Sequence, residues 1–476
     1  MKETTQFVIV KSQKDIHNIA IIIQYFQKEM ILGGRISMIK RKITALVLIA
    51  VMSFSLLTGC GKKSSDTSTD NTDGVVEIKW MFWDDLTATE DLMSKGYAEV
   101  IERFNEQYAG RYHCTPITTN LEEYDTKLNA LVAANNCPDV FICNPGPNLT
   151  QYVESGTAKD LTDILKKKES KWYDSFTEGI FERMTYDGKI YAVPTNFAAA
   201  LVFYNTEIFE KAGATIPTTF TEWIATCEKI QGAGYTPISC SAGTAWCLSM
   251  IAGYLCDRAG GPDNLIGVNA GTVDWTSESF LNAGEKLVEL SKYFQKTAAG
   301  DSNDQATASF YNGEAAMLVQ GSWAIGQING NNPEMEPKCG VFSFPAIEGG
   351  ADPNRMIVKT DNLVMSSKTK YEDACIALMK CFTDETAQKY TAEVGGKIPI
   401  IKVDYDKEKA PAQLSYVMDI LTKSTGTLGF YNESLASVEA GDTFDNSMVD
   451  LFLGSISVKE AFQNVQEFYQ EHVWKK

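Results

Sequence analysis

From Val75 onward, strand-like and helix-like patterns of hydrophobic and polar residues alternate along the chain. Residues 76–83 are rich in β-branched and aromatic side chains and predict a strand that ends at Trp83. Helical patterns follow over about 90–108 and again after Asn120, where apolar positions repeat on one face up to Asn135. The short apolar run 138–143 predicts a buried strand. This alternation predicts an α/β fold with a mostly parallel sheet and helices on both faces.

A second α/β series begins after an apolar strand that we expect at about 191–205. It predicts a helix at 220–231, a strand at 237–240 and a long helix at 245–256. In such folds, ligands collect beyond the carboxyl ends of the strands. The candidate sites are therefore 83–85, 143–144 and 193–197.

The pattern before Val75 is different and is typical of an exported lipoprotein. A basic head at 38–42 precedes an apolar run of about 15 residues, 43–57, and then Thr58-Gly59-Cys60. Leu57 to Cys60 resembles the bacterial lipobox, in which the cysteine is lipidated and becomes the first residue after cleavage. Residues 38–59 are therefore predicted to be a signal peptide, and the Ser/Thr/Asp-rich stretch 60–74 a flexible tether.

Residues 1–37 precede this signal. If they were translated, its basic segment would not lie at the amino terminus, and the leader would be unusually long. We expect that they are not translated, since Gly33-Gly34 lies where an in-frame ribosome-binding sequence often reads as Gly-Gly before Met38. The alternative is a short amphipathic helix at about 16–30.

Composition and charge narrow the possible functions. The 476 residues carry 43 Lys and Arg against 61 Asp and Glu, a formal net charge of −18, which disfavours a nucleic-acid surface. The sequence has only three histidines, far apart from one another, and this disfavours a histidine zinc site or a Ser-His-Asp arrangement. An EF-hand-like calcium loop is also missing from the sequence, so no metal or cofactor is expected.

Cysteines are numerous but irregularly spaced. Ten remain after Cys60, none in a C-x-x-C motif, and several lie in apolar runs. Buried free thiols are one interpretation. A few disulfides, for example Cys240–Cys247 or Cys247–Cys256, are the alternative, because an exported protein permits them.

Five motifs occur in order along the body of the chain. They are YAVP at 191–194, FYN at 203–205, PTTFTEW at 217–223, FYNGEAAMLVQGSW at 310–323 and GGKIP at 395–399. With the lipobox, they resemble the family 1 extracellular solute-binding proteins of ABC sugar importers, the relatives of maltose-binding protein. The resemblance covers nearly the whole chain from Val75.

The resemblance implies a two-lobed periplasmic-binding-protein-like fold of the class II type, with a hinge between the lobes. Three chain crossings are expected, near 196–200, 341–344 and 395–399. Lobe 1 would then comprise 75–196 plus 342–392, and lobe 2 would comprise 200–340 plus 396–476.

Sugar binding calls for aromatic platforms and planar polar groups, since sugars present apolar C–H faces and a ring of hydroxyls. Trp323 matches the family's stacking position, and Trp246 lies where relatives have a second aromatic residue. Trp83 ends the first strand, and Tyr431 lies in a late aromatic loop that resembles a third platform. Core packing is the alternative for the tryptophans.

Polar candidates stand at the ends of the predicted strands. Asp84 and Asp85 follow Trp83, with helix capping as their alternative role. Asn144 is either a ligand residue or a turn residue before Pro145. Asn196 lies at the first crossing, where a hinge hydrogen bond is the alternative. Asp361 lies where the chain has returned to the first lobe, and loop capping is its alternative.

The resemblance therefore implies a lipid-anchored receptor on the extracytoplasmic face of the cell membrane. It would be a monomer that captures a carbohydrate and delivers it to the permease subunits of an ABC transporter. A receptor for a polyamine or another small polar solute is the alternative from another class. Glycoside hydrolysis is the enzymatic alternative, but no motif marks its pair of carboxylates.

Overall fold

The computed structural model describes residues 74–87 and 91–475, which belong to one compact unit, Asn71–Lys476. The predicted extension 1–37, the signal peptide 38–59, Cys60 and nearly all of the tether lie outside the described residues. Across 74–87 and 91–475, no helix combines the length and the apolar character needed to cross a bilayer.

The first part of the chain alternates strands and helices, as its hydrophobic pattern predicts. The side chains of Asp91 and Asn120 accept hydrogen bonds from the backbone N–H groups of Met93 and Glu123, and this caps the first two helices. The elements are β1 (Val76–Phe82), α3 (Leu92–Gln107), β2 (Tyr112–Thr118), α4 (Leu121–Ala133), β3 (Val140–Cys143), α5 (Pro147–Glu154), η1 (Ile164–Lys168), α6 (Ser170–Tyr173), η2 (Glu182–Met184), β4 (Thr185–Tyr186) and β5 (Lys189–Ile190).

The middle of the chain begins with a long strand and repeats the alternation. The helices predicted at 220–231 and 245–256 are α8 and α9, and a capping box of Thr219 and Glu222 starts α8. The elements are β6 (Val193–Asn205), α7 (Thr206–Ala212), α8 (Phe220–Gly232), β7 (Thr236–Ser239), α9 (Ala245–Gly260), α10 (Pro262–Ala270), α11 (Glu278–Ser291), α12 (Asn303–Tyr311), β8 (Ala315–Gly321), α13 (Ala324–Asn331), η3 (Pro333–Lys338) and β9 (Cys339–Phe342).

A second long strand opens the last part of the chain, which is otherwise mainly helical. The elements are β10 (Arg355–Met365), α14 (Glu372–Thr383), α15 (Glu385–Glu393), α16 (Ala412–Thr422), β11 (Gly426–Leu428), α17 (Val438–Phe452), α18 (Val458–Phe468) and η4 (Tyr469–Val473).

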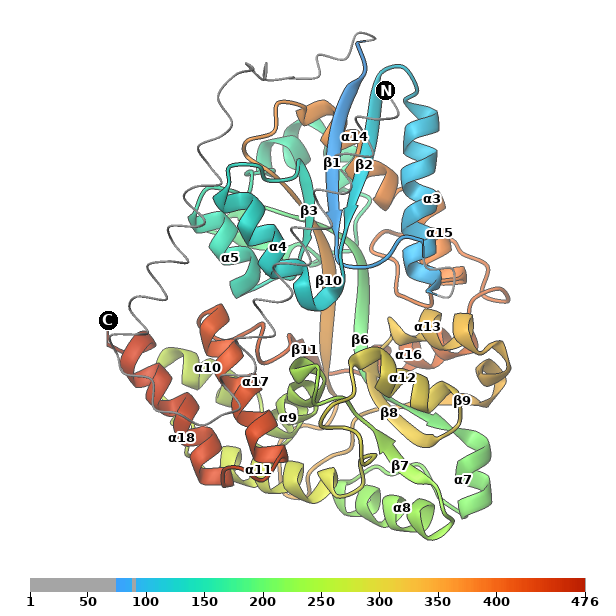
Figure 1. The fold of residues 1–476 in the computed structure, drawn as a ribbon, viewed down its shortest axis with the longest axis vertical. Helices are drawn as coiled ribbons and strands as arrows, with labels where there is room; N and C mark the ends of the chain where they lie inside the picture. Colours follow the sequence, from blue (N-terminus) through green and yellow to red (C-terminus); the bar gives the residue numbers. More distant parts are fainter. Residues whose placement is uncertain (1–73, 88–90, 476) are drawn as a thin grey trace, which may run out of the picture. The chain divides into compact units, whose positions relative to one another are not determined.

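The described residues form a nine-stranded sheet in which β6 and β10 are the central pair. Its order is β2-β1-β3-β10-β6-β8-β7, with β11 added to β10 and β9 added to β6. β1 pairs parallel with β2 and β3, and β7 pairs parallel with β8, whereas β10 and β6 run antiparallel to each other. Figure 1 shows β6 and β10 running from the region of β1–β3 to the region of β7–β9.

Buried hydrophobic side chains of the described residues gather in three clusters. The first cluster surrounds β1–β3 and includes Trp80 and Phe141. The second surrounds β7, α9 and α17 and includes Trp275 and Phe444, and a smaller third cluster includes Phe203. The first two clusters are the cores of two lobes, and the two-lobed α/β fold is confirmed.

The long strands carry the chain between these cores. Val193 of β6 belongs to the first cluster and Val202 to the second, while Ile357 of β10 belongs to the second and Leu363 to the first. Residues 342 and 344 pack in the second cluster, so the return to the first lobe is made along β10 rather than at 341–344. The numerical lobe boundaries stay predictions.

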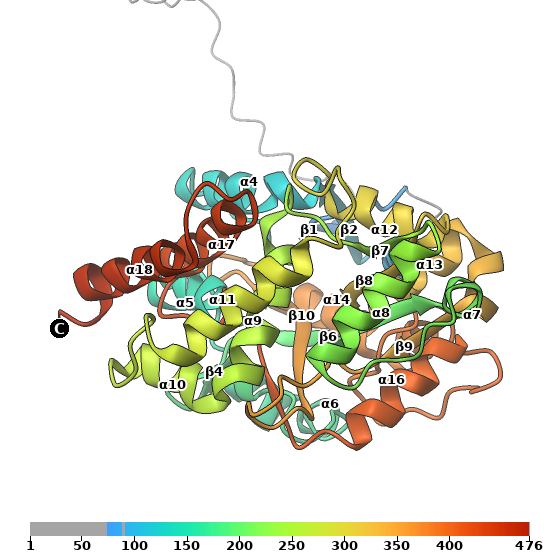
Figure 2. The ribbon, with the colours of Figure 1, turned by 90° about the horizontal axis from the view of Figure 1, so that it is seen from below.

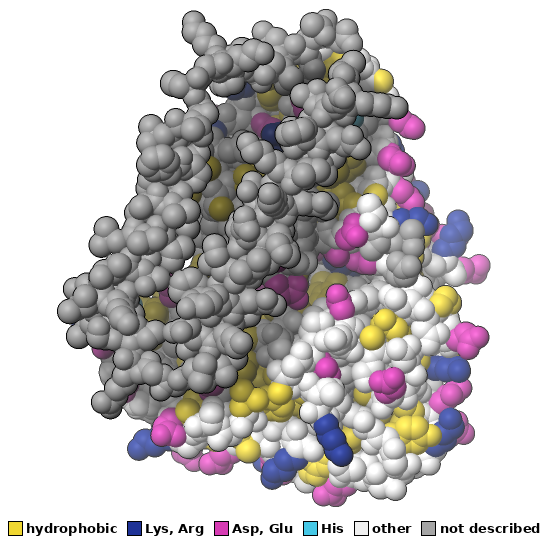
Figure 3. Space-filling model, in the orientation of Figure 1, with side chains coloured by type: hydrophobic (Ala, Val, Ile, Leu, Met, Phe, Trp, Pro, Cys, Tyr) yellow, Lys and Arg dark blue, Asp and Glu magenta, His cyan; other side chains and the backbone are white. Residues whose placement is uncertain are grey.

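Helices cover the sheet in the second lobe. α9 and α11 lie side by side there, as Figure 2 shows from below, and α17 packs on α9. On the described surface visible in Figure 3, acidic side chains are scattered among basic ones rather than gathered in one patch.

Within the described part of the chain, the ten cysteines are free thiols, nine of them buried and Cys137 half-buried. Cys240, Cys247 and Cys256 thus form none of the disulfides considered from the sequence. Burial raises the pKa of the Cys247 thiol well above its ordinary value, so the group stays protonated and behaves as a small hydrophobic side chain.

Candidate functional site

A cavity of about 200 Å³ lies where β1, β6 and β10 come together with the starts of α3, α4, α9 and α12 and with α13. Residues that pack against the first cluster and residues that pack against the second both line it. Six of the residues predicted from the sequence share this lining: Trp83, Asp84, Asn196, Trp246, Trp323 and Asp361.

Aromatic side chains form one wall of the cavity. The ring centroids of Trp246 and Trp323 lie 6.0 Å apart with a nearly perpendicular interplanar angle of 68°, and Phe430 lies 6.0 Å from Trp323. Trp83 contributes a third indole from the other lobe, 5.4 Å from the ring of Tyr124. The wall therefore offers half-buried indole surface from both lobes.

Gly321 explains how Trp323 comes to lie at this wall. A Cβ atom at position 321 would stand only 2.0 Å from the six-membered ring of Trp323. The absence of a side chain at the end of β8 thus lets the indole of Trp323, the N-cap residue of α13, pack back against this strand. This is a physical reason for the spacing of the Gly-Ser-Trp motif.

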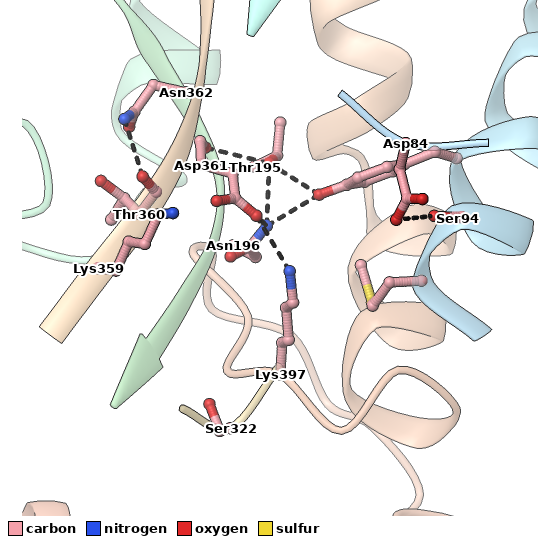
Figure 4. Close-up of polar contacts among 12 residues, drawn as sticks. Asp84, Ser94, Thr195, Asn196, Ser322, Lys359, Thr360, Asp361, Asn362 and Lys397 are labelled. Carbon is pink, nitrogen blue, oxygen red and sulfur yellow. Dashed lines mark hydrogen bonds and ion pairs between the residues drawn. The ribbon is translucent and has the colours of Figure 1, made fainter. Parts of the chain in front are cut away.

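The polar floor of the cavity centres on Asp361. Oδ2 of Asp361 accepts hydrogen bonds from Nδ2 of Asn196 at 2.8 Å and from Nζ of Lys397 at 3.0 Å. Asn196 also donates to the hydroxyl oxygen of Tyr97, at 2.8 Å. Figure 4 shows Lys397 reaching toward Asp361 and Asn196. Asn196 therefore makes hydrogen bonds to Tyr97 and Asp361 and also lines the cavity, and its contact with a ligand stays a prediction.

Backbone register brings these residues together. β6 and β10 pair Asn196 with Asp361, and the pairing shifts between Asp361 and Asn362. Burial alone would raise the pKa of Asp361, but the charges of Lys397 and Lys359 and the hydrogen bonds hold it below its ordinary value. Asp361 is therefore ionised at neutral pH and accepts hydrogen bonds.

A second carboxylate group lies near the start of α3. Oγ of Ser94 is 2.9 Å from Oδ2 of Asp84 and 2.8 Å from Oδ2 of Asp91. Figure 4 shows the contact between Ser94 and Asp84. Burial, followed by the negative charge of Asp91, raises the pKa of Asp84 to about 7. Because Asp91 caps α3, the capping role considered for Asp84 belongs to Asp91 instead.

Three predicted residues do not line the cavity. Asp85 is exposed and accepts hydrogen bonds from the backbone N–H and the hydroxyl of Thr87. Asn144 is half-buried, and its Oδ1 has no hydrogen-bond partner among the described residues. Tyr431 is 1% exposed and packs on Phe444 in the second cluster. Ligand contact by these three residues stays a prediction.

Several lining residues were not predicted from the sequence. Lys359 lies two positions before Asp361 on β10, so the two-residue period of a strand places both on one face. Lys397 belongs to the GGKIP motif, but the sequence does not indicate its ion pair. Phe430 is not itself a lining residue, but it packs against both indoles, whereas its neighbour Tyr431 packs on Phe444.

The described part of the chain has no cluster of metal-binding side chains. Among residues 74–87 and 91–475, no three His, Cys, Asp or Glu side chains gather in a way that could hold a metal ion.

A two-lobed α/β fold with an aromatic and polar cavity between its cores defines a class of ligand-binding protein. The chain belongs to the family described as bacterial extracellular solute-binding protein, whose model matches residues 89–389. The family is one of binding proteins. The recognition made from the five sequence motifs is confirmed.

Individual relatives agree with this assignment. An uncharacterized ABC transporter extracellular-binding protein of Pyrococcus horikoshii is 23% identical over 82% of this chain and 87% of its own. A multiple sugar-binding protein of Streptococcus mutans is 24% identical over 62% of this chain and 70% of its own. Among solved structures, a chitin oligosaccharide binding protein matches 83% of this chain and 98% of its own, with a TM-score of 0.76 and 24% identity.

Proposed function

We propose that this protein is the extracytoplasmic substrate-binding component of an ABC transporter and that it captures a sugar or a short oligosaccharide. The observation that carries the proposal is the cavity itself, which sets Trp246 and Trp323 against the polar floor of Asn196, Asp361 and Lys397. Relatives with sugar-binding names support the same substrate class.

The chemistry of the cavity suits a pyranose. The apolar C–H face of a sugar stacks on an indole, while its hydroxyls donate to ionised Asp361 and accept from Lys397. A volume of about 200 Å³ is below the roughly 300–1,000 Å³ typical of pockets for drug-sized ligands. A sugar of one or two rings therefore fits the enclosed part better than a long chain does.

Binding is proposed to favour a closed arrangement of the lobes. A ligand that contacts Trp83 on one side and Trp246 on the other gains interactions only when both lobes approach it. The Asn196–Asp361–Lys397 network joins β6, β10 and the segment after α15, and it would act as the pivot. The closed receptor is the form that the permease would recognise.

Export and anchoring complete the proposal. Cleavage before Cys60 and acylation of that cysteine would hold the protein, a monomer, on the outer face of the cell membrane. One acyl chain binds a membrane only marginally, so multiple acylation of Cys60 would matter for retention.

A polyamine or another amine-bearing solute is the second candidate. Asp84 and Asp91, close together beside aromatic side chains, are the observation that favours it. The raised pKa of Asp84 also resembles that of a catalytic acid. Asp361, however, is tied by Lys397 and Asn196 and is not free to act as its partner, so hydrolysis is not proposed.

A thermal-shift screen tests the function. The panel contains glucose, maltose, raffinose, xylotriose, chitotriose, putrescine and spermidine, and each incubation is checked for hydrolysis products. Stabilisation by at least one sugar, with no product formed, is the expected result. Stabilisation by the amines alone would favour the second candidate, and product formation would favour an enzyme. The Tyr416→Ala variant, which changes an exposed aromatic residue on α16, serves as a control that binds normally.

A further inference from the structure

Lys359 places a positive charge beside indoles from both lobes. Its Nζ lies 5.2 Å from the ring centroid of Trp83 and 5.9 Å from that of Trp323. Trp83 packs against the first cluster and Trp323 against the second. Both distances are within the range of a cation–π contact. The ammonium group thus occupies the part of the cavity where a stacked sugar would lie.

Besides the two indole rings, the Lys359 ammonium has a carboxyl group nearby, that of Glu433. Its Oε1 lies 4.0 Å from Nζ of Lys359, which is too long for a hydrogen bond. Its Oε2 is buried and has no hydrogen-bond partner among the described residues, and the whole residue is only 7% exposed. Burial raises the pKa of Glu433, and the charges of Lys359 and Arg183 oppose this rise. A buried oxygen without a hydrogen-bond partner is costly, so this oxygen favours a movement that brings a cationic donor to it.

Glu433 lies where a loop of the second lobe meets a turn of the first lobe. The loop that carries Glu433 also carries Phe430 and Tyr431, which are buried in the second cluster. At the turn after β3, a Cβ on Gly146 would stand only 2.1 Å from the carbonyl oxygen of Glu433, so the two backbones approach closely. Glu433 therefore lies at a seam between the loop of one lobe and the turn of the other.

We propose that the ligand displaces the Lys359 ammonium from the indole faces and that this ammonium then forms a hydrogen-bonded ion pair with Glu433. The inference rests on the sugar site proposed above, and it makes Lys359 a positioning residue. A movement of about 1 Å brings Nζ of Lys359 to hydrogen-bond distance from Oε1, and rotation of the carboxyl group would present Oε2 to the same donor. Ligand binding at the indoles thereby ties β10 to the 430–436 loop.

The exchange also bears on the choice of ligand. An uncharged sugar face replaces the ammonium on the rings without repelling it. A cationic group at the same place would meet the charge of Lys359, so a polyamine would be disfavoured at Trp83 and Trp323.

The ligand-free state provides the first test. Indole N–H signals are recorded by NMR for the wild type, for Lys359→Met and for the control Lys368→Met, which alters an exposed lysine. Trp83→Phe and Trp323→Phe assign the two signals. Lys359→Met should shift both of them and Lys368→Met neither. Unchanged Trp83 and Trp323 signals in Lys359→Met would overturn the proposal.

The ligand-bound state provides the second test, with the sugar from the panel that raises the thermal midpoint most. Glu433→Gln should weaken its affinity at least about fivefold in the wild type, but less than about twofold in the Lys359→Met background. Lys359→Arg, which keeps the charge, should restore the sensitivity to Glu433→Gln. Circular dichroism checks that each variant is folded.

The outcomes separate this inference from the proposed function. Equal losses from Glu433→Gln in both backgrounds would overturn the exchange and leave the sugar site intact, since additive effects mean that Glu433 acts on affinity independently of Lys359. Failure of every sugar in the panel to bind would overturn both the proposed function and the exchange.

Discussion

Nζ of Lys397 and Oδ2 of Asp361 lie 3.0 Å apart and form an ion pair in which both side chains are at least nine-tenths buried. Asp361 comes from β10, and Lys397 comes from the segment that follows α15. The pair therefore joins two of the segments on which the proposed hinge depends, and it does so at the floor of the cavity.

Removing one partner of this pair should destabilise the protein strongly. Asp361→Asn leaves the Lys397 ammonium buried without a counter-charge, and such changes cost about 3–5 kcal/mol. Urea denaturation measures the loss. Replacing both partners, in Asp361→Asn with Lys397→Met, should recover part of it. A loss below about 1 kcal/mol in the single variant would show that the pair does not hold the structure together.

Asp84 should make stability fall as the pH rises. Its folded pKa of about 7 is above the value of 3.8 expected for an ordinary Asp, so the folded state holds more protons than the unfolded state between those values. The unfavourable contribution is absent below about pH 4 and complete above about pH 7.

The Asp84→Asn variant tests that prediction. It should be more stable than the wild type at pH 8, by on the order of 1–2 kcal/mol after allowance for partial exposure, and about equally stable at pH 4. Asp85→Asn, at the exposed neighbouring position, should change the pH profile in the opposite sense if at all, because hydrogen bonds from Thr87 lower the pKa of Asp85. A wild-type profile retained in Asp84→Asn would contradict the assignment.

Gly321→Ala should damage the site more than the fold. The new methyl group meets the ring of Trp323, so the indole must move away from the cavity wall. We expect at least about a tenfold loss of sugar affinity and a destabilisation of about 1–3 kcal/mol. Gly232→Ala is the matched control, since its Cβ meets no atom within 4 Å. Equal affinities of the two variants would mean that the position of Trp323 is unimportant.

Cys60→Ala should release the protein from the membrane. Cell fractionation is expected to find the wild type with membranes and the variant in the soluble extracytoplasmic fraction. Mass spectrometry of the wild type should detect no peptide from residues 6–31. Membrane retention of Cys60→Ala would refute the lipid anchor. Peptides from residues 6–31 would refute the prediction that residues 1–37 are not translated.

Hydrophobic period and capping residues were sufficient to predict several elements of the first two thirds of the chain, but the elements after α9 were not predicted. β1, α3, α4, β3, α8 and α9 all begin and end close to the expected positions, because Asp91, Asn120 and Thr219 supply local caps. The return of the chain to the first lobe could not be read this way. β10 is buried along nearly its whole length, and its two halves belong to different cores, so burial alone does not show where one lobe ends and the other begins.

The site was predictable where a motif or a strand end marked it. Trp323, in the Gly-Ser-Trp motif, and Asp84, just after β1, are examples. The ion pair of Lys397 joins β10 to the segment after α15, which lies 36 positions further along the chain, and no local pattern shows such a contact. Likewise, the direction of Phe430 and Tyr431 is decided by packing in the second cluster rather than by the loop sequence.

Titration calorimetry of the wild type and Trp323→Ala with the best sugar of the panel tests the central claim most directly. The lost stacking surface should weaken affinity at least about tenfold, equivalent to about 1.4 kcal/mol, with little change in the unfolding midpoint. An unchanged affinity in a folded Trp323→Ala variant would contradict the claim that sugar binds in this cavity.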